Sequence, residues 1–321
     1  MKRPPPGLTL FLLAPVLGEL VSGHQGPLEF LNPIALVVFS LPYGCGALIC
    51  RELMVRWKKG WGSLILLGLA YGIYEEAVVV RSLFNPQWEE LGAMAEYGYA
   101  AGINWTWSFM VLHFHTAISI AASVMLAEIL YPSRRGQRWL NDWTFGLAAL
   151  YLLLWTPLGW WMTDYRPPEL HYALSIAAIG ALGAAAWRLP GPSVRSALPQ
   201  RKAPSALWFF LIGCLNTPVI FIGIALSAEH AWPPLVVTLA ALCAVDALTL
   251  WLIWVLSGRG AGWEDRHRLA LVAGLLAFFL FFGIAKDFEQ FNGHSIVALL
   301  AVIGLWRIAQ AAASQAPCLH D

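Results

Sequence analysis

The chain is poor in charged residues: only 12% of its 321 residues are Asp, Glu, Lys or Arg, whereas a soluble domain has about 25%. Hydrophobic residues account for 59% of the sequence, and the mean hydropathy is +0.63. This composition excludes a water-soluble fold. The 20 Lys and Arg residues almost balance the 19 Asp and Glu residues, and the net charge of +1 provides no broad basic surface for a nucleic-acid partner.

Cysteine pairs and the common cofactor motifs are also missing. The chain has 5 cysteines and no C-x-x-C, which is typical of small buried hydrophobic residues rather than of disulfides or zinc ligands. It contains no H-E-x-x-H, no Walker A motif and no G-x-S-x-G elbow. His113 and His115 are two residues apart, which does not match the spacing of metal ligands on a helix. The sequence therefore predicts no metal site and no organic cofactor.

Long apolar runs are what the chain has in abundance. A bilayer core about 30 Å thick is crossed by about 20 helical residues, and a backbone group left unpaired in hydrocarbon is costly. Ten segments approach or satisfy this rule: 8–22, 33–55, 62–84, 103–130, 141–162, 171–187, 206–227, 233–256, 269–284 and 295–311. We therefore predict an all-α, polytopic integral membrane helix bundle of about ten transmembrane helices.

The basic residues are distributed unevenly between alternate loops. All but three of the 20 Lys and Arg residues fall in loops on one predicted side, the exceptions being Arg81, Arg166 and Lys286. Because Lys and Arg collect in cytoplasmic loops, this asymmetry predicts that both termini are cytoplasmic and that loop 85–102 lies outside the cell membrane.

The loop 189–205 is the longest predicted cytoplasmic loop, and it contains four prolines. Proline-rich segments of this kind usually separate helix groups rather than continue a helix. We interpret the loop as a linker between a six-helix membrane region, 1–188, and a four-helix membrane region, 206–321.

Ionisable residues inside the predicted helices are few. A charged side chain at the centre of a transmembrane helix costs about 2.5 to 3.5 kcal/mol, so such residues should face the bundle interior and are candidates for function. They concentrate in the first region, and only one central acid lies in the second: Glu19, Glu75, Glu76, Arg81, His113 and His115, then Asp246.

Two of these residues are predicted to lie at similar depths in the bilayer. Segments 62–84 and 103–130 are consecutive and should pack side by side. With a rise of about 1.5 Å per residue, Glu75 and His113 both fall in the outer half of the bilayer. His115 lies about 200° around the helix from His113, so only one of the two imidazoles can face Glu75. We expect His113 to be the partner.

A stripe of small residues supports the same helix contact. Gly68, Gly72 and Glu75 lie on one narrow face of the predicted helix. Small residues four positions apart let a neighbouring backbone approach closely. The stripe that carries Glu75 is therefore predicted to be buried against the next helix.

The ordered acid and histidine residues resemble a known family. The pattern is Glu75-Glu76, then Phe109-Met-Val-Leu-His113, then His171-Tyr-Ala-Leu-Ser175. Over about residues 70–175 it is similar to the CAAX prenyl endopeptidase and bacteriocin-processing (CPBP) family of glutamate intramembrane proteases. The resemblance implies metal-independent peptide hydrolysis, with Glu75 or Glu76 as general base, His113 as its partner and His171 supporting the oxyanion.

Two other functions fit the same residues. In a secondary transporter, Glu75 and His113 would bind a proton or cation, and helix breaks near Pro86 and Pro218 would open the site. Further polar residues would line the pathway: Glu19, Arg81, Asn85, His115 and Asp246.

In a structural subunit, the same polar cluster would only hold helices together. The expected partners are the lipid bilayer and a membrane peptide or small solute, and the sequence indicates no oligomeric state. The peptidase hypothesis assigns roles to particular atoms and is the most directly testable of the three.

Overall fold

Helices that could cross a membrane make up most of the computed structural model, which describes residues 4–191, 202–260 and 262–314. Nine helices in these ranges are long and apolar enough: α3 (Pro33–Arg56), α4 with η2 (Trp61–Val79), α6 with η3 and α7 (Trp105–Leu130), α8 (Asp142–Met162), α9 (Glu169–Arg188), α10 (Ala206–His230), α11 (Leu235–Leu256), α12 (Asp265–Glu289) and α13 (His294–Ser314). A tenth apolar helix, α1 with η1 (Pro6–Val21), is shorter. The predicted all-α polytopic bundle is confirmed.

The remaining elements are short and lie between the long helices. They are α2 (Pro27–Phe30), α5 (Met94–Tyr97), β1 (Tyr99–Ala100), β2 (Ile103–Asn104) and η4 (Pro132–Arg134). The two strands form an antiparallel hairpin in which Tyr99 pairs with Asn104. This hairpin and α5 belong to the long connection between η2 and α6.

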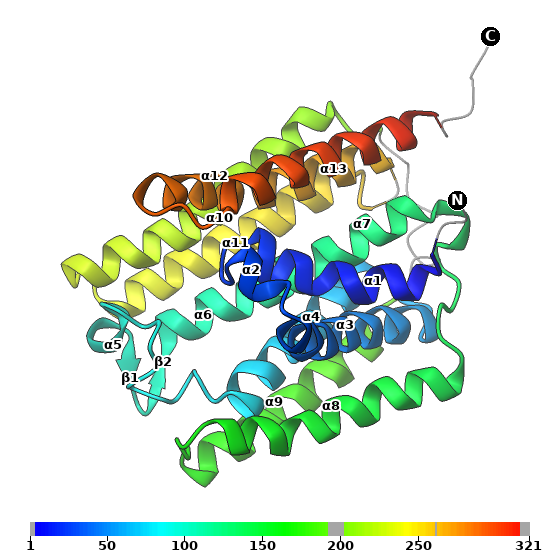
Figure 1. The fold of residues 1–321 in the computed structure, drawn as a ribbon. Helices are drawn as coiled ribbons and strands as arrows, with labels where there is room; N and C mark the ends of the chain where they lie inside the picture. The colour runs from blue at the N-terminus through cyan, green and yellow to red at the C-terminus, as the bar shows by residue number, and fades with distance from the viewer. Residues whose placement is uncertain (1–3, 192–201, 261, 315–321) are drawn as a thin grey trace.

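The long helices form three groups (Figure 1). A central group consists of α1, α3, α4 and the α6–α7 helix; α10 to α13 lie on one side of it, and α8 and α9 lie on the other. In the most apolar window of each helix, 67% of the α4–η2 residues and 61% of the α6–α7 residues are buried, but only 11% in α9 and α11 and 6% in α13. The α4–η2 and α6–α7 helices are therefore the most buried, whereas α9, α11 and α13 present most of their apolar surface to lipid. In the outer group α12 is 50% buried, as is α3 in the central group.

Glycines bring the two most buried helices together. A Cβ atom added at Gly72 would lie 3.0 Å from a Leu112 side-chain atom and 3.2 Å from the His115 Cβ, and one at Gly68 would lie 3.3 Å from the Thr116 Cα. These positions have room for hydrogen but little for a larger group. The predicted contact along the Gly68–Gly72 stripe is confirmed.

Three helices change from α to π geometry part-way along their length. The π segments are η1 (Val16–Val21), η2 (Tyr74–Val79) and η3 (His115–Ala122). π segments are rare and occur frequently at functional sites. The helix break predicted near Pro218 is absent, because α10 runs as one helix from Ala206 to His230.

The two ends of the bundle differ in charge. One end carries the loops 57–60 and 131–141, which are rich in Lys and Arg, and we call it the basic end. The opposite end carries the loops 22–32 and 80–104, which contain several glutamates, and we call it the acidic end.

A candidate intramembrane acid–imidazole site

Three carboxylates and one imidazole lie together where the π segments meet. Glu19 is on η1, Glu75 and Glu76 are on η2, and His115 is the first residue of η3. Glu19, Glu75 and His115 are 4%, 7% and 2% exposed. Glu19 and Glu75 are both close enough to His115 to interact with it electrostatically. We call these four residues the acid cluster.

Glu76 is the carboxylate that His115 contacts directly. The His115 Nε2 atom lies 2.8 Å from Glu76 Oε1, and the Ser82 hydroxyl donates a hydrogen bond to Glu76 Oε2. The Trp107 indole in turn donates to the Ser82 oxygen, at 3.0 Å. Both oxygens of Glu76 are thus held in place.

Glu75 lies among polar groups that lack partners. Its Oε2 atom is buried and has no hydrogen-bond partner within the described residues. Tyr71 and Trp155 lie beside Glu75, and the Trp155 indole is close enough to donate to the Glu75 carboxylate. The Tyr71 hydroxyl is likewise buried without a partner there. Leaving one such group unpaired costs about 1 to 3 kcal/mol. A proton on Glu75 or a polar ligand atom would satisfy these groups.

Aromatic rings enclose the imidazole of His115. The centroids of the Tyr43, Tyr71 and Phe114 rings lie 5.7, 5.8 and 5.8 Å from that of His115. Tyr43 also lies beside Glu19 and so connects that carboxylate to His115. These rings shield the imidazole, and His115 is only 2% exposed.

Glycines on neighbouring helices make room for two of the rings. A Cβ atom at Gly18 would lie 2.5 Å from a Tyr43 ring atom, and one at Gly46 would lie 2.2 Å from a Tyr71 ring atom. Sequence reasoning missed Tyr43 and Tyr71, although a tyrosine hydroxyl in the middle of an apolar run is a signal that could have found them.

The expected pairing of Glu75 with His113 is wrong. The His113 Nδ1 atom lies 3.0 Å from Asp246 Oδ2 on α11, and the Asn216 amide donates to Asp246 Oδ1 at 3.1 Å. The Gly72 stripe faces the side of α6–η3 that carries His115, so His113 points toward α10 and α11. The pair of His113 and Asp246 instead links α11 to the bundle.

His171 does not join the acid cluster. Its Nε2 atom lies 2.8 Å from the Ala101 carbonyl oxygen, and its ring packs edge-on against Phe84, with centroids 5.5 Å apart. His171 therefore fastens the start of α9 to the hairpin loop at the acidic end. The oxyanion role implied for it by the family resemblance has no geometric support.

Arg81 and Asn85 also form hydrogen bonds with backbone groups at the acidic end. Arg81 Nη2 donates to the carbonyl oxygens of Gly159 and Thr163, at 3.0 and 2.9 Å, and so satisfies the end of α8. Asn85 Oδ1 accepts a hydrogen bond from the Gln87 N–H at 3.0 Å, within a turn. Neither side chain contacts a residue of the acid cluster in the described structure.

A family comparison agrees with this architecture. The model of an uncharacterized membrane protein family matches residues 8–318. The chain belongs to this family. The match covers every membrane-crossing helix, whereas the resemblance to glutamate intramembrane proteases spans a third of the chain and stays a hypothesis. Searches of curated proteins and of solved structures returned no match.

A second group of charges lies at the basic end, and we call it the basic-end network; Arg51, Glu52 and Glu128 are buried, whereas the Asp142 side chain is 82% exposed. It joins four guanidinium groups to four carboxylates: Arg51, Arg56, Arg135 and Arg268 with Glu52, Glu128, Asp142 and Asp265. Arg51 is fully buried; its Nη1 atom lies 2.9 Å from Glu52 Oε1 and donates to the Gln137 carbonyl at 2.7 Å. Its guanidinium stacks 3.6 Å from the Trp139 ring centroid. The network ties loop 131–141 to the helix ends.

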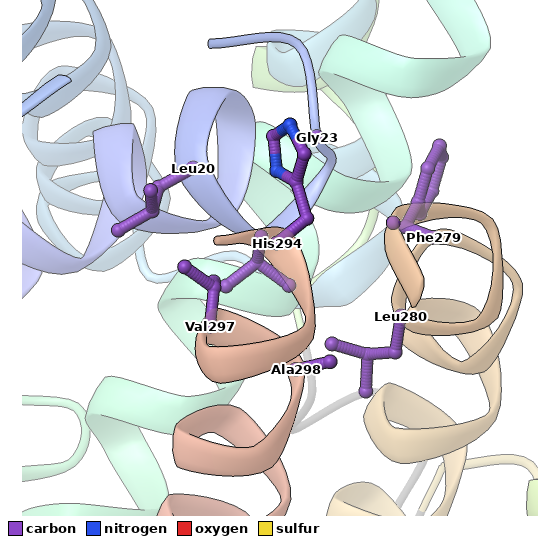
Figure 2. Close-up of a pocket in the computed structure, with 9 residues that line it drawn as sticks. Leu20, Gly23, Phe279, Leu280, His294, Val297 and Ala298 are labelled. Carbon is purple, nitrogen blue, oxygen red and sulfur yellow. The ribbon is translucent and has the colours of Figure 1, made fainter. Parts of the chain in front are cut away.

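One crevice lies close to the acid cluster but does not reach it. It is lined by residues of η1, α12 and α13, and Figure 2 shows His294 on α13 next to Gly23 in the turn that follows η1. The crevice has no room for a water molecule. Within the described ranges, no three His, Cys, Asp or Glu residues are grouped so as to hold a metal ion.

Proposed function

We propose that the chain is a proton-coupled membrane protein of the secondary-transporter class, in which the acid cluster binds and releases protons. The observation that carries this proposal is the charge of the cluster. Three carboxylates, Glu19, Glu75 and Glu76, share a buried region with one imidazole, His115. If all three acids were ionised and His115 were protonated, the four groups would carry a net charge of −2. A protonated His24, 3.9 Å from Glu19, would still leave one negative charge unbalanced.

Such an imbalance is costly in a buried site. Moving an ion out of water costs several kcal/mol even after the protein relaxes, and like charges repel strongly at low dielectric. Proton uptake by the carboxylates removes this cost without any other partner. Because the Glu75 carboxylate lies beside the unpaired hydroxyl of Tyr71, a proton on Glu75 would also give its unpaired oxygen a hydrogen to donate.

The π segments supply an element that protonation could move. All four cluster residues are on π segments, and a π turn holds one more residue than the α turn it replaces. Conversion between the two geometries rotates the following side chains by about 100°. A change of protonation in the cluster could thereby be coupled to rotation of the α4–η2 helix against the α6–η3 helix, which pack across Gly72 on α4.

Proton uptake between pH 8 and pH 5 tests this proposal on purified protein. An exposed glutamate, with a pKa of about 4.3, takes up little charge in that window. We expect the wild type to bind protons there that Glu75→Gln and Glu76→Gln fail to bind, and the exposed-site control Glu89→Gln to match the wild type. Equal uptake in all four proteins would overturn the proposal. Uptake of small solutes into liposomes, driven by a pH gradient, would then identify the cargo.

Peptide hydrolysis is the second candidate, supported by the unpaired groups around Glu75. A carboxylate oxygen beside a hydroxyl and an indole N–H could activate a water and stabilise an oxyanion. This version of the mechanism needs neither His113 nor His171. Cleavage of a membrane-peptide library in the presence of a chelator, lost in Glu75→Gln and retained in His171→Gln, would favour it over transport.

We further propose that the acidic end faces outward and the basic end faces the cytoplasm. The asymmetry of Lys and Arg between the loops supports this orientation. In intact cells, a membrane-impermeant thiol reagent should label Glu89→Cys and not Lys58→Cys, in a background without the native cysteines. The reverse labelling pattern would contradict the orientation and leave the proton-binding proposal intact.

A further inference from the structure

His24 lies between the buried acid cluster and the surface of the acidic end. It follows η1, and its Nε2 atom is 3.9 Å from Glu19 Oε2 and 3.4 Å from Glu90 Oε1. The side chains of His24 and Glu90 are 44% and 43% exposed, whereas that of Glu19 is 6% exposed. One imidazole nitrogen thus lies between a buried carboxylate and a half-exposed one.

The contacts continue inward from Glu19. Tyr43 lies beside Glu19, the Tyr43 ring is 5.7 Å from the His115 ring, and His115 contacts Glu76 at 2.8 Å. Glu90 is also close enough to Glu76 to interact with it electrostatically. A continuous series of ionisable side chains therefore connects His24 to the far side of the cluster.

The turn that carries His24 is held from two directions. The His24 N–H donates to the Ser22 hydroxyl at 3.3 Å, and Lys286 Nζ on α12 donates to the Gly23 carbonyl at 3.1 Å. His294 on α13 lies next to Gly23, as Figure 2 shows. The ionisable groups around this turn are thus Glu19, Glu90, Lys286 and His294, and the two acids are the ones that contact the His24 ring.

We propose that His24 carries protons between Glu90 at the surface and Glu19 in the acid cluster; this inference rests on the proton-binding function proposed above. Protonated Glu90 gives its proton to His24 Nε2, which leaves a carboxylate and an imidazolium. The same nitrogen then gives the proton to the Glu19 carboxylate, which becomes a carboxylic acid, and the imidazole is neutral again.

The geometry suits this step in two respects. Both carboxylates face the same ring nitrogen, so the imidazole need not flip between receiving and delivering the proton. An imidazole also gains and loses a proton near neutral pH, which suits it to a shuttle between two acids. Water reaches the half-exposed His24 directly, so Glu90 assists the transfer but is not the only group that can give His24 a proton.

The test is a rapid pH jump from 8 to 5, with proton uptake by the purified full-length protein followed by an indicator dye. The relevant signal is the part of the uptake that Glu75→Gln and Glu76→Gln lack. In His24→Gln we expect this part to keep its amplitude and to slow by about a hundredfold. The matched control is His230→Gln, which removes an exposed histidine and should leave the rate unchanged.

Chemical rescue separates proton transfer from a structural role. Free imidazole should restore the rate in His24→Ala and have no effect on the wild type, a result that a packing defect would not produce. A wild-type rate in His24→Gln, with the cluster uptake intact, would overturn the relay alone. If Glu75→Gln and Glu76→Gln remove no uptake from the wild type, the proton-binding proposal fails, and the relay falls with it.

Discussion

The acid cluster and the basic-end network are two groups of ionisable residues with buried members in one helix bundle, and they differ in charge balance. In the network each carboxylate has a guanidinium to match it, and the side chains hold a loop against three helices. In the acid cluster three carboxylates share the buried imidazole of His115, and the half-exposed His24 lies 3.9 Å from Glu19. One oxygen each of Glu19 and Glu75 accepts no hydrogen bond within the described residues.

The comparison separates structural charge from functional charge. Both regions contain buried ionisable side chains, among them His115 in the cluster and Arg51 in the network, so burial by itself does not identify a functional site. A balanced group satisfies its own charge and gains little from a ligand, whereas an unbalanced group needs a proton or a cation. The pair of His113 and Asp246 is balanced in the same sense as the network, with one base and one acid.

The largest effect should come from breaking the balance of the basic-end network. Arg51→Met leaves Glu52 and Glu128 buried without their nearest cation, so we expect a loss of about 3 to 5 kcal/mol in the free energy of unfolding. Thermal unfolding in detergent would measure it. Arg138→Met is the control, because the Arg138 side chain is 59% exposed and pairs only with the exposed rim of the network, 3.8 Å from Asp142 Oδ1. Wild-type stability in Arg51→Met would show that the network is not structural.

A smaller loss in the free energy of unfolding is expected when the contact between α11 and the rest of the bundle is broken. Asp246→Asn removes the charged acceptor of the Asn216 amide and of His113, which should cost about 2 kcal/mol. A double variant with His113→Gln should recover part of this loss, because the two side chains act as one unit. Additive losses in the double variant would contradict the pairing.

Removing a charge from the acid cluster should not reduce the stability of the protein. Glu75→Gln keeps the shape of the side chain and removes one of the three negative charges that share the buried imidazole of His115, so stability should stay the same or rise by about 1 kcal/mol. Proton uptake should fall in the same variant. A loss comparable to that of Arg51→Met would show that the cluster, like the network, only holds helices together.

The smallest effect concerns Glu90 at the mouth of the cluster. Burial, with the nearby Glu76 carboxylate, raises the pKa of Glu90 in the folded chain, and His24 offsets part of the increase. A carboxyl group whose pKa is higher in the folded state stabilises the fold below its unfolded pKa of about 4.3. That contribution is lost as the pH rises through the folded pKa.

Glu90→Gln should remove this pH dependence. Between pH 4 and pH 8, the wild type should lose a few tenths of a kcal/mol more than the variant, about the size expected for a half-exposed side chain. Unfolding temperatures at the two pH values would measure the difference, with the exposed Glu89→Gln as control. The same pH dependence in the wild type and Glu90→Gln would be the contrary result.

Local patterns in the sequence were enough for much of the architecture. Length and apolarity located the membrane helices, and the glycine spacing at Gly68 and Gly72 predicted which face of one helix would be buried. Glu75, Glu76 and His115 were named as site or pathway residues before the structure was known. The prediction that His113 pairs with Glu75 was wrong. A helix with one histidine on each of two faces does not reveal which face the neighbouring helix will cover.

By itself, the sequence determined that this protein folds in a membrane and where its helices lie along the chain. Hydrophobicity, helix length and small-residue spacing are enough for this because they act over a few turns of one helix. Only the tertiary structure decided which charges meet. Glu19 is 56 residues from Glu75, and their convergence on His115 depends on how several helices pack and on the added rotation of the π segments. The charge imbalance exists only after that packing, since no single helix contains all its members.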